Sequence, residues 1–423
     1  MRLDGIFGAL IVHSDSLLVD GESLVPPNVM LLQDWFDEDT TTLRVMNPFA
    51  PRFRGTGEMA LQVLDRDYSV DGVELSAYAY DSTLINGRGR ARDDVKLPLT
   101  VFTVQPTFSA LISAVNTGGE FFYEVMVDSH RLFIVSLDSR TLAANLEVDS
   151  FIIAPGERVD FVVLATQPNV TSYWVRAELI RQGTGLPIVE DDVIKGGLAI
   201  LRYEGASNDD PTSTRRSCSA AEPCTTFNCP FAGFRANQYK SCMSLDDVTN
   251  VQSNDELQQQ YGVNDVDFEE YFLNWGFPIG SSINARKFYA PTAPFSGPNS
   301  NNVKQCNEED CNANGCFCTF MLDVPFNETV QLVLSNLQPG APFLAHHSVY
   351  LHGHSFTVLK VGYPEFDPVT GLWTQANTDV ICNNALCTQP SWNGSSPALN
   401  TDRPVVKNTV VIPARGYVVI RFR

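Results

Sequence analysis

The sequence predicts an all-β protein made of sandwich-type domains. Short apolar runs alternate with clusters of Gly, Pro, Asn, Asp and Ser, a pattern that is typical of strands joined by tight turns. Phe151–Ile153 and Phe161–Leu164, for example, flank the turn signal Pro155-Gly156-Glu157-Arg158. Hydrophobic residues make up 44% of the 423 residues, which is enough for folded cores, and this length predicts two or three domains.

Candidate strands follow one another along two regions of the chain. The first region holds candidates at 29–35, 122–127, 131–137, 151–153 and 161–164, with 82–90 ending in a glycine-rich turn, and the second holds candidates at 269–275, 282–286, 331–337, 358–362, 407–413 and 416–422. We expect 122–127 and 131–137 to pair as a hairpin across Asp128-Ser129-His130. Asn86-Gly87-Arg88-Gly89-Arg90 opens no helix, so it predicts a turn rather than a dinucleotide-binding loop.

The charge balance argues against nucleic acid as a partner. The chain has 29 Lys and Arg against 49 Asp and Glu, a formal net charge of -20, whereas proteins that bind nucleic acid are usually basic. No run reaches the ~18 apolar residues of a membrane-spanning helix. Gly5–Val12 is an apolar run, but Asp4 precedes it and no small-residue cleavage site follows, so it does not predict a secretory signal.

The ten cysteines predict disulfide bonds and an oxidising compartment. They form three groups in loop-like sequence: Cys218, Cys224, Cys229 and Cys242; Cys306, Cys311, Cys316 and Cys318; Cys382 and Cys387. A zinc site is the alternative, but Cys316-Phe317-Cys318 is tighter than the usual two-residue gap. Glycosylation sequons at Asn169, Asn327 and Asn393 also favour a secreted glycoprotein.

One stretch, residues 346–356, concentrates the candidate metal ligands. It holds four of the six histidines, His346, His347, His352 and His354. In an extended strand, residues two apart share a face, so Tyr350, His352 and His354 are expected to line one side. Imidazole is the commonest metal ligand near neutral pH and suits copper and zinc. The other two histidines, His13 and His130, are expected at a strand end and in a turn.

At these residues the chain resembles the multicopper oxidases, and more narrowly the animal laccase-like ones. The family motif His-Pro-x-His-Leu-His-Gly-His-x-Phe corresponds to residues 347–356. The resemblance implies that His347 binds the mononuclear type 1 copper and that His352 binds one of the paired type 3 coppers. Tyr350 stands where the family has a type 2 copper ligand, and Ser348 replaces the proline. His354 matches a histidine that is not a ligand in the family.

The resemblance extends along the whole chain and implies tandem cupredoxin-like (plastocyanin-like) Greek-key β-sandwich domains. Residues 1–24 correspond to the last strand of a truncated first domain, 25–205 to a second domain without copper, 206–250 to a Cys-bearing linker, and 251–423 to a third domain. Within the linker, Cys224–Phe231 resembles a segment of animal laccase-like chains. The family's two upstream His-x-His pairs and its final His-Cys-His segment have no counterpart in residues 1–423, so the chain is expected to be truncated at both ends.

The resemblance implies a reaction but not a complete site. Family members oxidise phenols, amines or metal ions one electron at a time and reduce O2 to water with four coppers. His347 and His352 alone cannot hold four coppers, so we expect activity to be impaired in this chain, with no catalytic residue assigned. Three hypotheses stay open: part of a secreted laccase-like oxidase; a non-catalytic extracellular cupredoxin module with weak or no copper binding, which Tyr350 favours; and another metal site built from His347, His352 and His354 with a carboxylate.

Overall fold

The computed structural model describes two compact units. The described residues are 5–12, 18–19, 22–23, 28–35, 67–68, 74–76, 82–90, 97–119, 121–180, 196–276, 282–288, 305–306, 309, 311–312, 315–337, 346–371 and 373–423. Unit 1 comprises residues 1–229, 233–244 and 367–372, and unit 2 comprises residues 230–232, 245–366 and 373–423. His13, expected at a strand end, lies outside the described residues.

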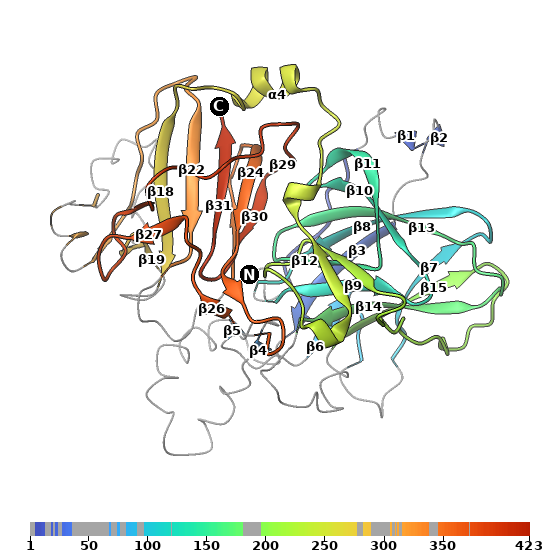
Figure 1. Cartoon of the computed structure of the whole chain (residues 1–423). Coiled ribbons are helices and arrows are strands. Elements are labelled where there is room, and N and C mark those ends of the chain that lie inside the picture. Colours follow the sequence, from blue (N-terminus) through green and yellow to red (C-terminus); the bar gives the residue numbers. More distant parts are fainter. Residues whose placement is uncertain are drawn as a thin grey trace, which may run out of the picture. The chain divides into compact units, whose positions relative to one another are not determined.

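Unit 1 is a sandwich of two sheets (Figure 1). The six-stranded sheet has the order β11 (Arg140–Val148), β10 (Leu132–Leu137), β13 (Arg158–Leu164), β8 (Ser109–Asn116), β3 (Asn28–Trp35) and β6 (Ser82–Ile85). The seven-stranded sheet has the order β17 (Lys240–Met243), β16 (Cys224–Phe227), β12 (Ser150–Ile153), β9 (Tyr123–Val127), β14 (Ser172–Leu179), β15 (Gly197–Tyr203) and β7 (Thr100–Val104). The all-β prediction is confirmed. Segment 206–250, predicted as a linker, adds β16 and β17 to this second sheet, whereas the predicted domain bounds stay a prediction.

Alternation of side chains explains the core of unit 1. Along β8, every second residue is buried, as expected for a strand with one face against a core. The rings of Phe151 on β12 and Phe161 on β13 lie 5.2 Å apart, so the two sheets meet through their apolar faces.

The predicted hairpin across Asp128-Ser129-His130 is wrong. β9 pairs with β12 and β14, whereas β10 pairs with β11 and β13, so the two strands belong to different sheets. The burial pattern of each strand shows that one face is packed against a core, but it does not show which strand lies beside it. The connection therefore carries the chain from one layer to the other, and His130 lies at this turn, as predicted.

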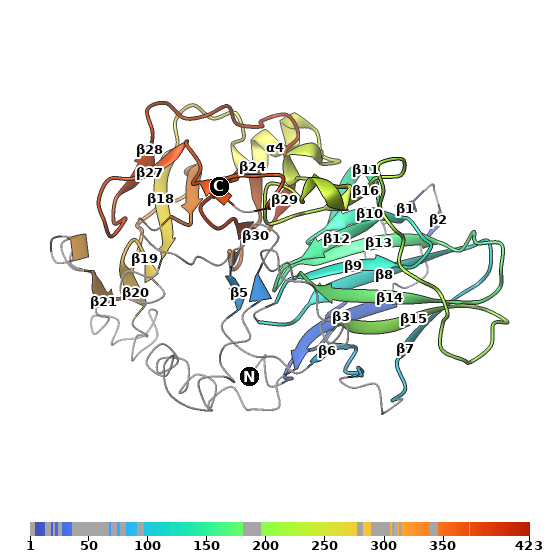
Figure 2. The same cartoon turned by 60° about the horizontal axis from the view of Figure 1, so that its bottom comes forward.

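Unit 2 is built around an eight-stranded sheet, seen at the left of Figures 1 and 2. Its order is β21 (Cys316–Cys318), β20 (Arg286–Phe288), β19 (Ser282–Ile283), β18 (Glu269–Gly276), β22 (Val330–Ser335), β31 (Tyr417–Phe422), β24 (Phe356–Gly362) and β29 (Val406–Lys407). Three short ribbons accompany it: β23 (His347–Tyr350) with β30 (Thr409–Ile412), β25 (Glu365–Phe366) with β26 (Trp373–Gln375), and β27 (Val380–Cys382) with β28 (Pro390–Trp392).

Helix α4 (Asn254–Tyr261) covers part of the unit 2 core. Ser253 and Glu256 form a capping box at its start, and Gly262 ends it in the left-handed conformation that glycine tolerates best. Leu257 and Tyr261 pack into a cluster with apolar residues of β22, β24, β29 and β31. The helix thus closes one side of the sheet with only two turns.

All ten cysteines are paired, which confirms the disulfide prediction. The bonds are Cys218–Cys224, Cys229–Cys242, Cys306–Cys318, Cys311–Cys316 and Cys382–Cys387. Each bond joins cysteines of the same sequence group, with separations of 5 to 13 residues. They therefore fix local loops rather than distant elements.

Residues 5–12, predicted as part of a closing strand, form no strand in the structure. Ile6, Leu10 and Val12 are exposed, and no sheet among the described residues covers them. A strand needs a neighbouring strand to satisfy its backbone hydrogen bonds, and no described strand pairs with this segment. Across the described residues, no helix is long and apolar enough to cross a membrane.

A buried arginine holds the last strand of unit 2. Arg421 on β31 is 4% exposed, and its guanidinium donates to Gln331 Oε1 at 2.6 and 3.1 Å. It also donates to the carbonyls of Gly262, Val263 and Asp265 and stacks 4.3 Å from the Phe268 ring centroid. One cation thus joins two strands to the loop that follows α4.

Replacing this cation is expected to destabilise unit 2. Arg421→Met leaves Gln331 and three carbonyls without their buried donor, so we expect a loss of ~2–4 kcal/mol in the free energy of unfolding. Arg423→Met is the matched control, because Arg423 makes a partly exposed pair with Asp265, worth ~0–1 kcal/mol. Urea unfolding monitored by tryptophan fluorescence checks both, and equal losses would contradict the assignment.

Candidate copper site

Strand β23 sets the position of the first candidate ligand. It pairs antiparallel with β30, with His347 opposite Ile412 and Tyr350 opposite Thr409. The Leu351 N–H continues the ladder by donating to the Asn408 carbonyl at 3.1 Å. This pairing holds His347 at one end of a short ribbon and Tyr350 at the other.

Two adjacent histidines at the start of β23 are both neutral near pH 7. His346 is buried, and its Nδ1 accepts from the Ala414 N–H at 3.0 Å, so its ring proton lies on Nε2. Burial, followed by the neighbouring His347, lowers the pKa of His346 to about 3. Burial likewise lowers the pKa of the half-buried His347 to about 4. Neutral imidazole is the form that binds metal, and His346 uses one of its nitrogens to hold the backbone instead.

The predicted strand face of Tyr350, His352 and His354 is only partly correct. β23 ends at Tyr350, and a turn follows in which the His354 N–H approaches the Leu351 carbonyl at 3.4 Å. Gly353 supplies the turn with a φ of +80°, a conformation that favours glycine. The rings of Tyr350 and His352 still lie 5.9 Å apart, so these two side chains are neighbours at the exposed end of the ribbon.

His354 is directed to a different contact. Its ring lies 5.6 Å from that of Phe422 on β31. Among the described residues, the one group of three or more His, Cys, Asp or Glu side chains within ligand distance is the cysteine group Cys306, Cys311, Cys316 and Cys318, whose sulfurs form two disulfides. Within the described residues, the structure therefore does not bring His347, His352 and His354 together with a carboxylate.

The donor set fits copper in part. His347 offers a neutral imidazole and His352 an exposed one, and imidazole is a ligand that copper accepts. Tyr350, 54% exposed beside His352, offers a phenol oxygen instead of a third imidazole. A phenol binds metal well only when it loses its proton, which normally happens near pH ~10. His346 anchors the strand. The sequence did not predict this role, because no spacing signal distinguishes a histidine that supports a strand from a metal ligand.

Sequence comparison identifies both units with one family. Residues 27–206 and residues 292–423 each match a family model described as multicopper oxidase. The first match lies within unit 1, and the second match includes the histidine-rich stretch.

Individual relatives are fungal laccases. Laccase-4 of Trametes villosa is 28% identical over 66% of this chain and 47% of its own length. Laccase-1 of Fomitopsis schrenkii is 24% identical over 95% of this chain and 61% of its own length. The chain thus spans about half the length of the curated relatives it matches. Because these relatives are fungal, the narrower animal resemblance stays a prediction.

Solved structures agree on the fold. The multicopper oxidase Fet3p, which functions in iron import, aligns with a TM-score of 0.60 at 16% identity, over 97% of this chain and 63% of its own. The laccase of Botrytis aclada aligns with a TM-score of 0.52 at 16% identity, over 94% of this chain and 58% of its own. The predicted cupredoxin-type β architecture is confirmed by these alignments. With two family models matched in order along it, the chain belongs to the multicopper oxidase family and is laccase-like.

Proposed function

We propose that this chain is part of a secreted laccase-like oxidase that takes electrons from a small reducing substrate and delivers them to O2. The substrate class is phenols, amines or metal ions. The observation that carries the proposal is the match of both units to multicopper oxidase models, together with His347 and His352 at ligand positions of the motif. Copper, when bound, would supply the one-electron redox chemistry, and the protein would supply the ligands and their geometry.

The chain's own residues would have distinct roles in this proposal. His347, held on β23 by pairing with β30, would be the ligand of the mononuclear copper. His352, in the turn that Gly353 permits, would be a ligand of a paired copper. His346 would position the strand through its hydrogen bond with the Ala414 N–H. The remaining ligands of a complete site are not assigned to this chain.

Secretion is part of the same proposal. Five disulfides are typical of proteins that mature in an oxidising compartment. Asn169, Asn327 and Asn393 are all exposed, as glycan acceptors must be. We also retain the animal laccase-like assignment as a proposal, on the resemblance of the Cys224–Phe231 segment.

A second candidate function is a non-catalytic extracellular cupredoxin module with weak or no copper binding. Tyr350 favours this candidate, because it stands, inside the chain, at a position where the family motif has a copper ligand. A phenol oxygen in place of an imidazole weakens copper binding at that position. The oxidase candidate predicts catalytic turnover and the module candidate predicts none, so an activity measurement can separate them.

Restoring the motif residue is expected to strengthen copper binding. Tyr350→His would put a second imidazole beside His352, where the two rings already lie 5.9 Å apart, so we expect at least ~10-fold tighter Cu(II) binding in isothermal titration calorimetry. His354→Ala is the control and is expected to leave the affinity unchanged. If instead His354→Ala abolished binding and Tyr350→His changed nothing, the alternative His347, His352 and His354 site would be correct.

Loss of the proposed mononuclear ligand is expected to abolish turnover. In the copper-loaded natural protein, His347→Ala should lower phenol-dependent O2 uptake by at least ~100-fold, because even residues that only support a ligand affect activity by up to that factor. An oxygen electrode measures the rate, with His354→Ala as the matched histidine control. Absence of any O2 uptake in the unmodified, copper-loaded protein would support the non-catalytic module.

A further inference from the structure

Two places in the sequence hold a pair of adjacent basic residues, and the fold treats these two pairs differently. They are Arg215-Arg216 and Arg286-Lys287, and no other Lys or Arg in the 423 residues stands next to a basic residue. Dibasic-specific serine endoproteases recognise such a pair and hydrolyse the peptide bond that follows it. They bind their substrate as an extended strand, so the chain around the pair must have its backbone available for pairing.

The first pair lies in a long exposed connection of unit 1. Residues 204–223, between β15 and β16, form neither helix nor strand, and residues 214–217 are all exposed. The side chains of Arg215 and Arg216 are 43% and 40% exposed. Exposed polar loops are preferred sites of proteolytic nicking, so this pair lies where a protease can reach it.

The second pair lies inside the eight-stranded sheet of unit 2. Arg286 and Lys287 belong to β20, which pairs with β19 on one side and with β21 on the other. Arg286 is only 5% exposed, and its Nη1 donates to the Asn284 carbonyl at 2.9 Å. A strand that is paired on both sides cannot add to the cleft of a protease, so the same motif is protected here.

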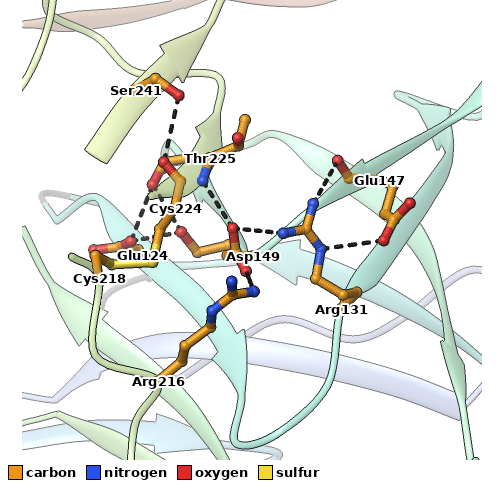
Figure 3. A network of polar contacts seen from close by, with 11 residues as sticks. Glu124, Arg131, Glu147, Asp149, Arg216, Cys218, Cys224, Thr225 and Ser241 are labelled. Atoms are coloured by element: carbon orange, nitrogen blue, oxygen red, sulfur yellow. Dashed lines mark hydrogen bonds and ion pairs between the residues drawn. A yellow bond between two sulfur atoms is a disulfide. The ribbon is translucent and has the colours of Figure 1, made fainter. Parts of the chain in front are cut away.

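Arg216 can leave its partner without stranding a buried charge (Figure 3). Its Nη1 donates to Asp149 Oδ1 at 2.6 Å. The other oxygen of the Asp149 carboxylate accepts from Arg131 at 2.9 Å and from the Thr225 N–H at 2.8 Å. Asp149 therefore keeps a cation and a backbone donor when Arg216 enters a protease subsite.

Arg215 can also leave its partner. Its Nη2 pairs with Glu178 Oε1 at 2.6 Å. Burial raises the pKa of Glu178 to about 7, and Arg215 opposes this rise. When Arg215 leaves, Glu178 can take up a proton from solvent near neutral pH, so no unpaired carboxylate remains in the protein.

The exposed residues 214–217 lie between two anchors. On one side, the Ser213 hydroxyl donates to Asp128 at 2.9 Å and accepts from the Trp174 N–H at 3.0 Å. On the other side, Cys218 forms a disulfide with Cys224. A cut between residues 216 and 217 leaves each anchor complete on its own side, so the rest of the fold is not disturbed.

We propose that the peptide bond between Arg216 and Ser217 is a processing site for a dibasic-specific serine endoprotease, and that the product is a two-chain protein. The step is a hydrolysis. The bond between the Arg216 carbonyl carbon and the Ser217 nitrogen breaks, and water supplies hydroxyl to the carbon and hydrogen to the nitrogen. The products are a carboxylate at Arg216 and an ammonium at Ser217. The class of protease rests on the secretion part of the proposed function, whereas the position of the cut rests on the exposure of this loop.

Sheet pairing holds the two pieces together after the cut. β16 and β17 follow residue 216, and β16 pairs in parallel with β12, which precedes it. Lys240 Nζ lies 2.5 Å from Glu124 Oε1, and Asn228 donates to Glu157 Oε2 at 2.8 Å, so polar contacts also join the pieces. All five described disulfides lie after residue 216, so none of them crosses the cut.

The test is incubation of the whole protein with a dibasic-specific serine endoprotease of the subtilisin class. N-terminal sequencing should find one new terminus, at Ser217, and none after Lys287. The two pieces should separate on a denaturing gel without reductant, yet elute together in size-exclusion chromatography of the native sample. Arg216→Gln should lose the cut, whereas Lys287→Gln, the matched control at the second basic pair, should leave the rate of cutting unchanged.

Synthetic peptides of residues 211–220 and 282–291 are the reference, because each carries its basic pair without a fold. A native protein that stays intact while the first peptide is cut would overturn the proposal. Cutting after Lys287 as fast as after Arg216 would remove its structural basis, since the fold would then protect neither pair. Pieces that elute separately would refute the two-chain product. None of these readouts depends on copper or on turnover, so they are independent of the oxidase proposal.

Discussion

Charged groups removed from water need a partner inside the protein, and both units depend on this constraint. Burying an ion without a partner costs several kcal/mol, so each buried charge selects the elements around it. Arg421 ties the last strand of unit 2 to β22 and to the loop after α4. In unit 1, Asp128 accepts two hydrogen bonds from Arg176 and one from Ser213, which fastens the segment around Ser213 to the sheet. Loops that would otherwise be exposed are thereby ordered against the sheets.

Backbone pairing gives the histidine stretch its geometry. β23 is short, and the ladder with β30 and the His346 contact to Ala414 help to determine where His347 lies. At the other end, the φ of +80° at Gly353 turns the chain, so His352 stays near Tyr350 while His354 packs on Phe422. Two histidines that are two residues apart therefore have different neighbours, which agrees with the different roles that the motif assigns to them.

Histidine and arginine serve different physical purposes in the two units. Burial keeps the imidazole of His347 neutral, so its ring retains the lone pair that a metal needs. His346 is also neutral, but its Nδ1 accepts from the backbone N–H of Ala414. Guanidinium groups keep their charge in any environment and present several donors, so Arg131 and Arg216 can share the Asp149 carboxylate. The second unit thus carries the proposed copper ligands, whereas the first carries a charged network that the family resemblance does not require.

The sequence by itself determined the β architecture, the presence of disulfides and the family, because these follow from local patterns: alternation, turn residues, clustered cysteines and the 347–356 motif. Which cysteines pair was left open by the sequence and was decided by the tertiary structure. It also located some of the strands, but it missed others, such as β8, β14 and β15, and it did not give their partners. Residues 122–127 and 131–137 were therefore predicted as a hairpin although they lie in different sheets. The charged network of unit 1 was not predicted at all. Glu124, Asp149, Glu178 and Arg216 are far apart in the chain, and only the folding of β9, β14 and residues 213–218 onto one another brings these side chains together.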